Sequence, residues 1–250
     1  MIGLVKGRLA AMLGAMVFAF ASCFFAPDRP GGQNGGTDAA FDSAITMDMR
    51  SGDALMGSGT CPSDDMSSSV DTCGTWGSQD VAKGGGVTRM TGALYTKVGS
   101  GGDRAECVTP INIDFSHGVS IDLQQPLATV NGDTTQFIAS FDQLGYVRIE
   151  TTFNSSLQIV ATCSGPGGTS SITTYSSAYR YLKIAQVSPG SSTVGAMYSS
   201  DGQSWNTMGS CSLTGNNLAL ASVRFGATAG TGSGGSRAAV WDDFKTCTTP

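Results

Sequence analysis

Short stretches that alternate apolar and polar residues follow one another through the second half of the chain. Turns rich in Gly, Ser, Asn and Pro separate them. A period of two places neighbouring side chains on opposite faces of a strand, so each stretch predicts a half-buried β-strand. The predicted strands are Gln136–Phe141, Tyr146–Phe153, Leu157–Thr162, Tyr179–Val187, Thr193–Tyr198, Ala219–Ala227 and Ala238–Phe244.

A helical pattern is missing from the same part of the sequence. After the N-terminal apolar run, apolar residues nowhere recur at three- and four-residue spacing over a dozen positions. Regular short strands without intervening helices predict a sandwich or a barrel. We therefore expect an all-β fold, a two-sheet antiparallel jelly-roll sandwich, formed by residues 41–250 as one domain, because sandwiches of ~200 residues have a single core.

Four motifs follow one another in the last third of the chain. They are Tyr179–Ile184 (YRYLKI), Tyr198–Trp205 (YSSDGQSW), Val223–Gly226 (VRFG) and Ala239–Phe244 (AVWDDF). Their order resembles the C-terminal half of concanavalin A-like jelly rolls, in particular the C-terminal domains of β-xylosidases and related secreted bacterial proteins. The resemblance implies the same jelly-roll fold. It does not select an activity, because this fold carries both enzymes and lectins.

The N-terminus has the organisation of an export signal. Lys6 and Arg8 precede an uncharged apolar run, Leu9–Ala21, and Cys23 follows directly after two small residues. Phe20–Cys23 resembles the lipobox of bacterial lipoproteins, which implies acylation of Cys23. We predict a lipoprotein signal peptide, a signal helix, over residues 1–22. An uncleaved membrane anchor is the alternative, because the uncharged stretch is just long enough to span a bilayer.

Residues 23–40 are dense in Pro, Gly and Asn and have no hydrophobic period, as is typical of a flexible tether. A lipid on Cys23 would attach this tether to a membrane. The expected location is therefore the cell envelope, on the outer membrane or the cell surface.

The number of cysteines agrees with export. The chain has seven cysteines, and assigning Cys23 to the lipid leaves an even set, which suits three disulfides in an oxidising compartment. No CxxC or CxxH spacing occurs, which excludes a zinc site of that type. Six cysteines permit 15 pairings; of these we favour Cys61 with Cys73 and Cys211 with Cys247. The remaining two cysteines are Cys107 and Cys163.

Four aromatic residues are candidate ligand contacts. Trp205 and Tyr198 flank Asp201-Gly202, a dipeptide that predicts a two-residue type I′ hairpin turn. The two rings would stack on a sugar, or else Trp205 would cover the hairpin and pack on the sheet. Trp76 and Tyr146 are further candidates on residue type alone.

Two aspartates are candidate ligands for calcium, which prefers oxygen donors. Asp242 lies in the last predicted strand, and Asp42 would lie near it if the terminal strands pair. The alternative is an edge strand with solvated acids. The single histidine, His117, follows Asp114 and Ser116, but neighbours on a strand face opposite sides, so we interpret His117 as part of a turn.

Charge and composition restrict the function. The formal net charge is −5, and no stripe of Lys and Arg is present, so we expect no nucleic-acid partner. Glucanases of this fold use an E-x-D-x-x-E strand, and neither Glu106 nor Glu150 stands in such a motif. We therefore expect a non-catalytic, lipid-anchored surface protein that binds carbohydrate or another extracellular polymer. The alternatives are a glycan-active enzyme on the same fold and a purely structural or adhesion protein.

Overall fold

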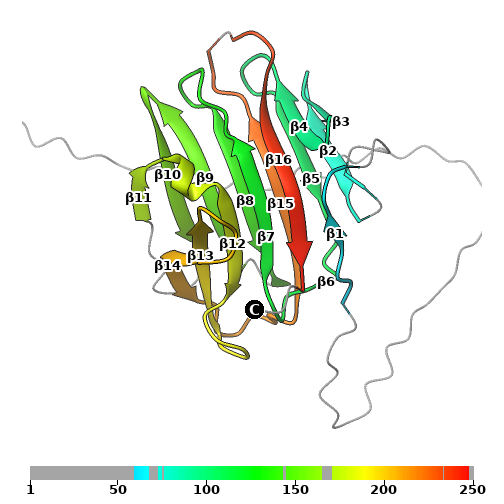
Figure 1. Cartoon of the computed structure of the whole chain (residues 1–250), viewed down its shortest axis with the longest axis vertical. Helices are drawn as coiled ribbons and strands as arrows, with labels where there is room; N and C mark the ends of the chain where they lie inside the picture. The colour runs from blue at the N-terminus through cyan, green and yellow to red at the C-terminus, as the bar shows by residue number, and fades with distance from the viewer. Residues whose placement is uncertain are drawn as a thin grey trace, which may run out of the picture. The chain divides into compact units, whose positions relative to one another are not determined.

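The computed structural model describes residues 59–67, 73–74, 76–142, 145–164, 171–232 and 234–247. The predicted signal, the tether, Cys23 and Asp42 lie outside these residues. The described part contains one turn of 3₁₀ helix, η2 (Ser177–Tyr179), and sixteen strands (Figure 1). The strands are β1 (Ser63–Asp64), β2 (Ser78–Ala82), β3 (Gly86–Met90), β4 (Ala93–Val98), β5 (Arg104–Val108), β6 (Ile113–Asp114), β7 (Val119–Gln125), β8 (Thr134–Ser140), β9 (Tyr146–Asn154), β10 (Ser156–Cys163), β11 (Ser171–Thr174), β12 (Tyr181–Gln186), β13 (Thr193–Ser199), β14 (Asn206–Ser212), β15 (Leu220–Thr228) and β16 (Arg237–Thr246).

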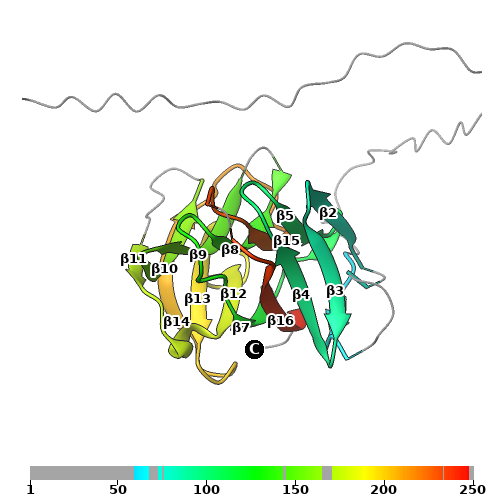
Figure 2. The same cartoon turned by 90° about the horizontal axis from the view of Figure 1, so that it is seen from above.

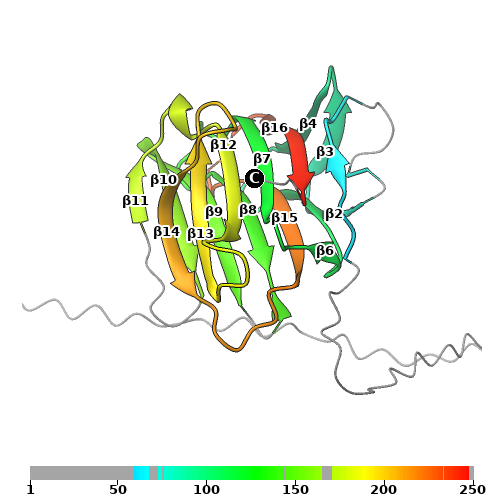
Figure 3. The same ribbon diagram turned by 60° about the horizontal axis from the view of Figure 1, so that its bottom comes forward.

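The strands form two antiparallel sheets that face one another (Figure 2). The β16 sheet has the order β14-β13-β12-β7-β16-β4-β3, with β1 paired to β16. The β15 sheet has the order β11-β10-β9-β8-β15-β5-β2, with β6 paired to β15. The last two long strands therefore lie in the middle of different sheets, and β7 and β16 run side by side (Figure 3). The predicted two-sheet concanavalin A-like jelly roll is confirmed.

The core is an aromatic cluster between the sheets. Trp241, Phe225 and Phe244 are fully buried, and the Phe225 ring centroid lies 5.3 Å from that of Trp241 and 5.5 Å from that of Phe244. Trp241 Nε1 donates to Thr96 Oγ1 at 3.1 Å, which satisfies the one polar group that the indole brings into the core. Burying these large rings supplies much of the hydrophobic stabilisation that holds two sheets together.

The six described cysteines form three disulfides, as predicted, but neither favoured pairing is correct. The bonds join Cys61 to Cys247, Cys73 to Cys107, and Cys163 to Cys211. The first pairing follows from the sheet: Ser63 in β1 pairs with Lys245 in β16, which brings Cys61 beside Cys247. The pairing of Cys61 with Cys73 was favoured because the two lie close in the sequence. Closeness in sequence does not show which strands are neighbours in a sheet, so the prediction was wrong. Since such bonds persist in oxidising compartments, the domain is extracytoplasmic.

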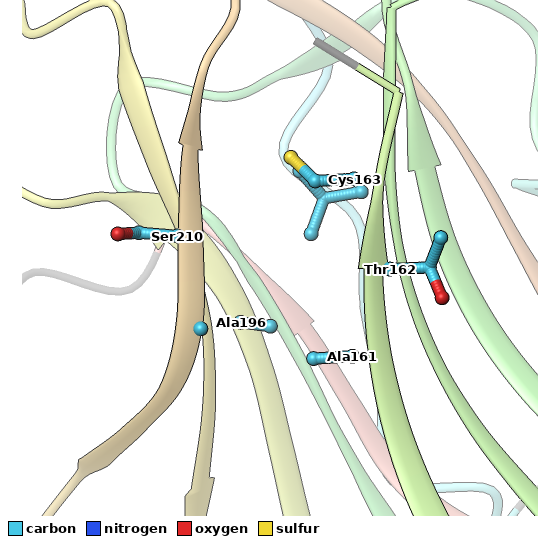
Figure 4. A pocket seen from close by; sticks show the side chains of 7 residues that line it. Ala161, Thr162, Cys163, Ala196 and Ser210 are labelled. Atoms are coloured by element: carbon cyan, nitrogen blue, oxygen red, sulfur yellow. The ribbon is translucent and has the colours of Figure 1, made fainter. Parts of the chain in front are cut away.

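Cys163 and Cys211 cross-link the two sheets at one edge. Cys163 ends β10, and Cys211 lies in β14 of the other sheet, with 6.1 Å between their Cα atoms. Nearby, the small side chains of Ala161 and Ala196 point toward one another between the sheets (Figure 4). The space that remains there has no room for a water molecule. The sheets therefore approach closely enough at this edge for the disulfide to form.

The predicted two-residue turn at Asp201-Gly202 is wrong. Strand β13 ends at Ser199 and β14 begins at Asn206, so a longer loop connects them. Gly202 takes the left-handed conformation with a φ of +73°, but Asp201 does not share it. The Asp201 carboxylate instead accepts the backbone N–H groups of Gln203 and Ser204, each at 2.8 Å, and this local closure replaces the tight turn. His117 does lie in a turn, between β6 and β7.

Candidate functional site

Polar side chains from four strands, with a glycine in a fifth between them, lie in one row across the β15 sheet. The register pairs Glu150 with Gln136, Gln136 with Gly226, Gly226 with Glu106, and Glu106 with Asp80. Because directly paired residues point to the same face of a sheet, these side chains lie side by side. We call Asp80, Glu106, Gly226, Gln136 and Glu150 the carboxylate row.

Alternation along the strands turns this row away from the core. In the four inner strands of the row, β5, β8, β9 and β15, the residues next to the row point inward and are buried. The row therefore occupies the outer face of the sheet. The apolar residues among these inward neighbours are Ala105, Cys107, Phe137, Ile149, Phe225 and Ala227.

Glu106 is the central acid of the row, and its side chain is shielded from solvent although it lies on an outer face. Arg224 Nη1 donates to Glu106 Oε2 at 2.6 Å, and Gln136 Nε2 donates to Oε1. Charge-assisted hydrogen bonds of this kind are short and directional. They compensate the charge of Glu106 and fix its orientation.

Asp80 is coupled to Glu106 through the same guanidinium. Arg224 Nη1 also donates to Asp80 Oδ2 at 3.0 Å, and Arg104 Nη2 donates to Asp80 Oδ1 at 2.7 Å. Since one nitrogen lies 2.6 Å from Glu106 Oε2 and 3.0 Å from Asp80 Oδ2, these two oxygens are at most about 5.6 Å apart. The Asp80 side chain is one-third exposed, so Asp80 is the member of the pair that is accessible to solvent.

Gly226 makes room for this arrangement. A Cβ at position 226 would lie 2.6 Å from Glu106 Cα and 2.7 Å from Glu106 Cγ. Such approaches are closer than van der Waals contact allows. The missing side chain in the middle of the row is therefore the space into which Glu106 extends toward Gln136.

Glu150 closes the other end of the row. Arg148 Nη1 lies 3.3 Å from Glu150 Oε2, and Thr152 Oγ1 donates to Glu150 Oε1 at 3.0 Å. Tyr146, one of the predicted ligand contacts, alternates with buried Val147 on the same strand and faces the same way as Arg148. Of the four predicted aromatic contacts, Tyr146 is the one that shares this face.

Trp76 belongs to the core cluster. Its ring centroid lies 4.7 Å from that of Phe244 and 5.7 Å from that of Phe225. Its Nε1 donates to Asp64 Oδ2 at 2.7 Å, and Asp64 also accepts Arg89 Nη1 at 2.9 Å. The structure thus gives Trp76 a packing role.

Trp205 and Tyr198 lie on different faces of the β16 sheet. Tyr198 pairs with buried Leu182, and its ring packs against Tyr179 with 4.3 Å between centroids. Lys183, the next residue after Leu182, points outward, and its Nζ lies 5.4 Å from the centre of the Trp205 ring. The two aromatics therefore do not form a single platform.

The surroundings of Asp242 bear on the calcium prediction. Burial raises the pKa of Asp242, and the nearby carboxylates of Asp122, Asp243 and Asp65 raise it further. Asp122, its cross-strand neighbour, is held by Arg180, whose Nε lies 2.7 Å from Asp122 Oδ1. Gln124 Nε2 donates to Asp242 Oδ2 at 2.9 Å. Arg180 is the counter-charge of Asp122 and Lys245 that of Asp243, so cationic side chains already occupy two of these acids and the donor set fits calcium poorly. Calcium binding remains a prediction.

The carboxylate row is not apparent from the sequence because the alternation pattern does not reveal two of its strands. Strands β2 and β5 are five residues long each and contain charged residues, so they do not stand out as apolar alternation. The detectable signal was in the outward positions: Glu150 in Tyr146–Phe153 and Gln136 in Gln136–Phe141 were already in predicted strands.

Two comparisons, with protein-family models and with curated proteins, found no match. The search of solved structures found similar folds. Apo Crh5 transglycosylase is 13% identical with a TM-score of 0.50, and the match covers 76% of this chain and 86% of that one. Crh5 transglycosylase in complex with NAG is also 13% identical, with a TM-score of 0.51 and the same coverage.

This likeness is one of fold, and it corrects the functional expectation. Both similar structures are of a glycan-active enzyme, a transglycosylase. The expectation of a non-catalytic binding domain is therefore wrong as the main interpretation. It rested on the absence of one linear motif, whereas a sheet can also assemble carboxylates from separate strands.

Proposed function

We propose that this protein is an extracytoplasmic enzyme that cleaves or transfers glycosidic linkages at the carboxylate row. The observation that carries the proposal is the Glu106–Asp80 pair, whose nearest oxygens bound to Arg224 are at most about 5.6 Å apart. Glycosidases that retain the anomeric configuration place their two carboxyl groups about 5–5.5 Å apart. The similar structures are of a transglycosylase, which agrees with this class of reaction.

The geometry favours Glu106 as the nucleophile. Arg224 and Gln136 orient its carboxylate, and the surrounding side chains exclude water from it. Arg104 Nε lies 3.8 Å from Glu106 Oε2, so bound sugar first has to displace Arg104 to reach this buried carboxylate. A Glu106 oxygen would then attack the anomeric carbon and form a glycosyl ester while the bond to the leaving sugar oxygen breaks. A fixed, desolvated nucleophile needs little reorganisation in the transition state.

Asp80 would act as the acid and base of the same reaction. It gives its proton to the leaving sugar oxygen, and in the second step it takes a proton from the hydroxyl that attacks the glycosyl ester. Because Arg104 and Arg224 both contact Asp80 in this structure, bound sugar has to displace Arg104 before Asp80 can hold the proton. The attacking hydroxyl comes from water in hydrolysis and from a second sugar in transfer.

The test is a labelled oligosaccharide panel with purified protein. The panel includes N-acetylglucosamine oligomers, because one similar structure holds that sugar. We expect chain cleavage or extension with retained anomeric configuration, and a loss of at least ~10²-fold in rate for Glu106→Gln and for Asp80→Asn. Asp65→Asn, an exposed aspartate after β1 outside the carboxylate row, should keep the wild-type rate.

Two results would reject the proposal. One is a panel on which the folded wild-type protein forms no product. The other is product formation that neither Glu106→Gln nor Asp80→Asn reduces. Inverted product configuration would exclude the Glu106 nucleophile specifically, because inversion proceeds without a glycosyl ester.

We also propose that the enzyme is attached to the cell envelope through a lipid on Cys23. The export-type N-terminus and the cysteine immediately after it support this attachment. Among the described residues no helix is both long enough and apolar enough to cross a bilayer. The three disulfides agree with an extracytoplasmic domain.

A further inference from the structure

A hollow of about 190 Å³ lies on the outer face of the β16 sheet. Strands β7, β12 and β16 contribute to its lining, and Trp205 stands among the lining residues from the loop after β13. It lies on the opposite sheet from the carboxylate row, so it does not depend on the proposed reaction.

Ser120 and Lys245 line the hollow, and Lys183 lies beside it as the other cross-strand neighbour of Ser120. Lys183 of β12 and Lys245 of β16 both pair with Ser120 of β7. Their strand neighbours Leu182, Ile184 and Phe244 are buried, so the lysines point outward. With about 4.8 Å between strands, the two lysine Cα atoms lie about 10 Å apart across a small hydroxyl side chain.

Some charged groups in and around the hollow have an oppositely charged or hydrogen-bonding partner, and one has no counter-charge. Lys245 forms an ion pair with Asp243, and Asp201 accepts hydrogen bonds from Ser199 Oγ and two backbone N–H groups. Among the described residues, Lys183 has no carboxylate partner. Its ammonium lies 5.4 Å from the Trp205 ring centre, and burial lowers the pKa of Lys183. A desolvated cation without a counter-charge favours an anionic ligand.

Asp201 also fixes the conformation of the loop that carries Trp205. Its carboxylate binds the backbone of Gln203 and Ser204, the residues just before Trp205, and these bonds lower the pKa of Asp201 to about 2. The indole is therefore presented from a loop that is already closed in the free protein. A preorganised indole thus stands beside an ammonium that has a cation–π contact but no carboxylate partner among the described residues.

We propose that this hollow binds a uronic acid unit of an acidic polysaccharide. The sugar ring stacks on Trp205, its carboxylate pairs with Lys183, and Ser120 Oγ donates to a carboxylate or hydroxyl oxygen. The site would hold a charged polymer on one face of the enzyme, independently of the chemistry on the other face.

Calorimetric titration with an oligogalacturonate tests this proposal. Lys183→Gln should weaken the Kd by ~10-fold or more, the usual loss for a hydrogen bond to a charged group. The matched control is Lys97→Gln, a lysine of the same sheet in β4 whose cross-strand neighbours are Ala238 and Gly86 and not Ser120, and which should keep the wild-type Kd. The fully methyl-esterified oligomer, which has no charge, should bind wild-type protein as weakly as the acid binds Lys183→Gln.

Trp205 is tested with two substitutions. Trp205→Ala should weaken binding by at least ~5-fold, and Trp205→Phe, which keeps an aromatic face, should recover part of it. A thermal melt of each variant shows whether it folds. The proposal is overturned if folded Lys183→Gln binds as tightly as Lys97→Gln, if esterification does not weaken binding, or if the wild-type protein does not bind.

Discussion

Glu106 and Glu150 lie in one cross-strand row of the β15 sheet, with Gln136 and Gly226 between them. These are the two glutamates of the chain, and they come from strands that are not neighbours in the sequence. Glu106 extends over Gly226 to accept a hydrogen bond from Gln136. Hydrogen bonds connect the row from Asp80 through Arg224 and Glu106 to Gln136, although no linear motif contains these residues.

Gly226→Ala tests whether the row depends on its missing side chain. The new Cβ would meet Glu106 Cα and Cγ, and the backbone of Ala105 in the central strands cannot move away freely. We expect a loss of roughly 2–4 kcal/mol in the free energy of unfolding, as for overpacking in a closely packed region. Urea unfolding measures it. Gly86→Ala is the control, because a Cβ at Gly86 meets nothing within 4 Å.

Activity gives a second readout of the same change. If Glu106 is the nucleophile, Gly226→Ala should reduce the rate even under conditions in which the protein remains folded. If Gly226→Ala has normal stability and a normal rate, the position of Glu106 does not depend on the missing side chain at residue 226.

Peptide mapping of the unreduced protein tests the disulfides. We expect cross-linked peptides for Cys61 with Cys247, Cys73 with Cys107, and Cys163 with Cys211, and no free thiol among the six. In the loop-entropy model, removing the first bond costs up to about 5 kcal/mol and the second up to about 4 kcal/mol, since they close 186 and 34 residues. Variants with both cysteines of one bond changed to serine would show which disulfide contributes more to the free energy of unfolding. A peptide joining Cys61 to Cys73 would contradict the strand pairing of β1 with β16.

The fold was predictable because period-two alternation is a local property. Each of the seven predicted strands corresponds to an observed strand with ends shifted by at most a few residues, as with Tyr179–Val187 and the observed Tyr181–Gln186. Inward residues such as Ile149 and Phe225 are buried and apolar, and the alternation of apolar and polar residues is visible in the sequence.

Strand order was not predictable from the same signal. Which strand lies beside which decides that Asp80 meets Glu106, that Cys61 meets Cys247, and that Lys183 and Lys245 flank Ser120. Alternation gives the face of each residue but not its neighbour across the sheet. The candidate site, which is made of cross-strand neighbours, therefore needed the structure.

Cys23→Ser tests the lipid attachment. Only a thiol can carry the thioether-linked lipid, so the variant should lose incorporation of labelled fatty acid and accumulate as unprocessed precursor. Fatty-acid labelling and immunoblotting of the two forms measure this. Ser22→Ala, which keeps a small residue before the cysteine, should be processed normally. Normal processing of Cys23→Ser would indicate an ordinary signal peptide.

Acid should destabilise the domain through aspartates that bind loops. Backbone N–H groups of Ser100, Gly99 and Gly84 lower the pKa of Asp103 to about 2. Burial raises the pKa of Asp133, but hydrogen bonds from Arg237 and from the Gly230 and Val130 N–H groups more than offset this and leave it lowered.

A carboxyl group with a lower pKa in the folded state stabilises the fold above its unfolded pKa of about 3.9. That contribution disappears as the pH falls toward the folded value, so the Tm should be steady above pH ~5 and fall steeply between pH ~4 and ~2. Calorimetry over this range measures the fall. Asp103→Asn should lower the Tm at neutral pH and flatten the acid slope, because the variant has no proton to take up at this position.

Asp133→Asn should have a larger effect at neutral pH. The Asp133 side chain is fully buried, and Arg237 Nε donates to it at 2.8 Å, so the substitution leaves a buried guanidinium without its counter-charge. Breaking such a pair costs about 3–5 kcal/mol. Ile149→Val is the control, because it destabilises the fold by removing a buried methyl group without disturbing a carboxylate, and it should keep the wild-type acid slope. If Asp103→Asn and Asp133→Asn both keep that slope, these two aspartates do not cause the loss of stability in acid.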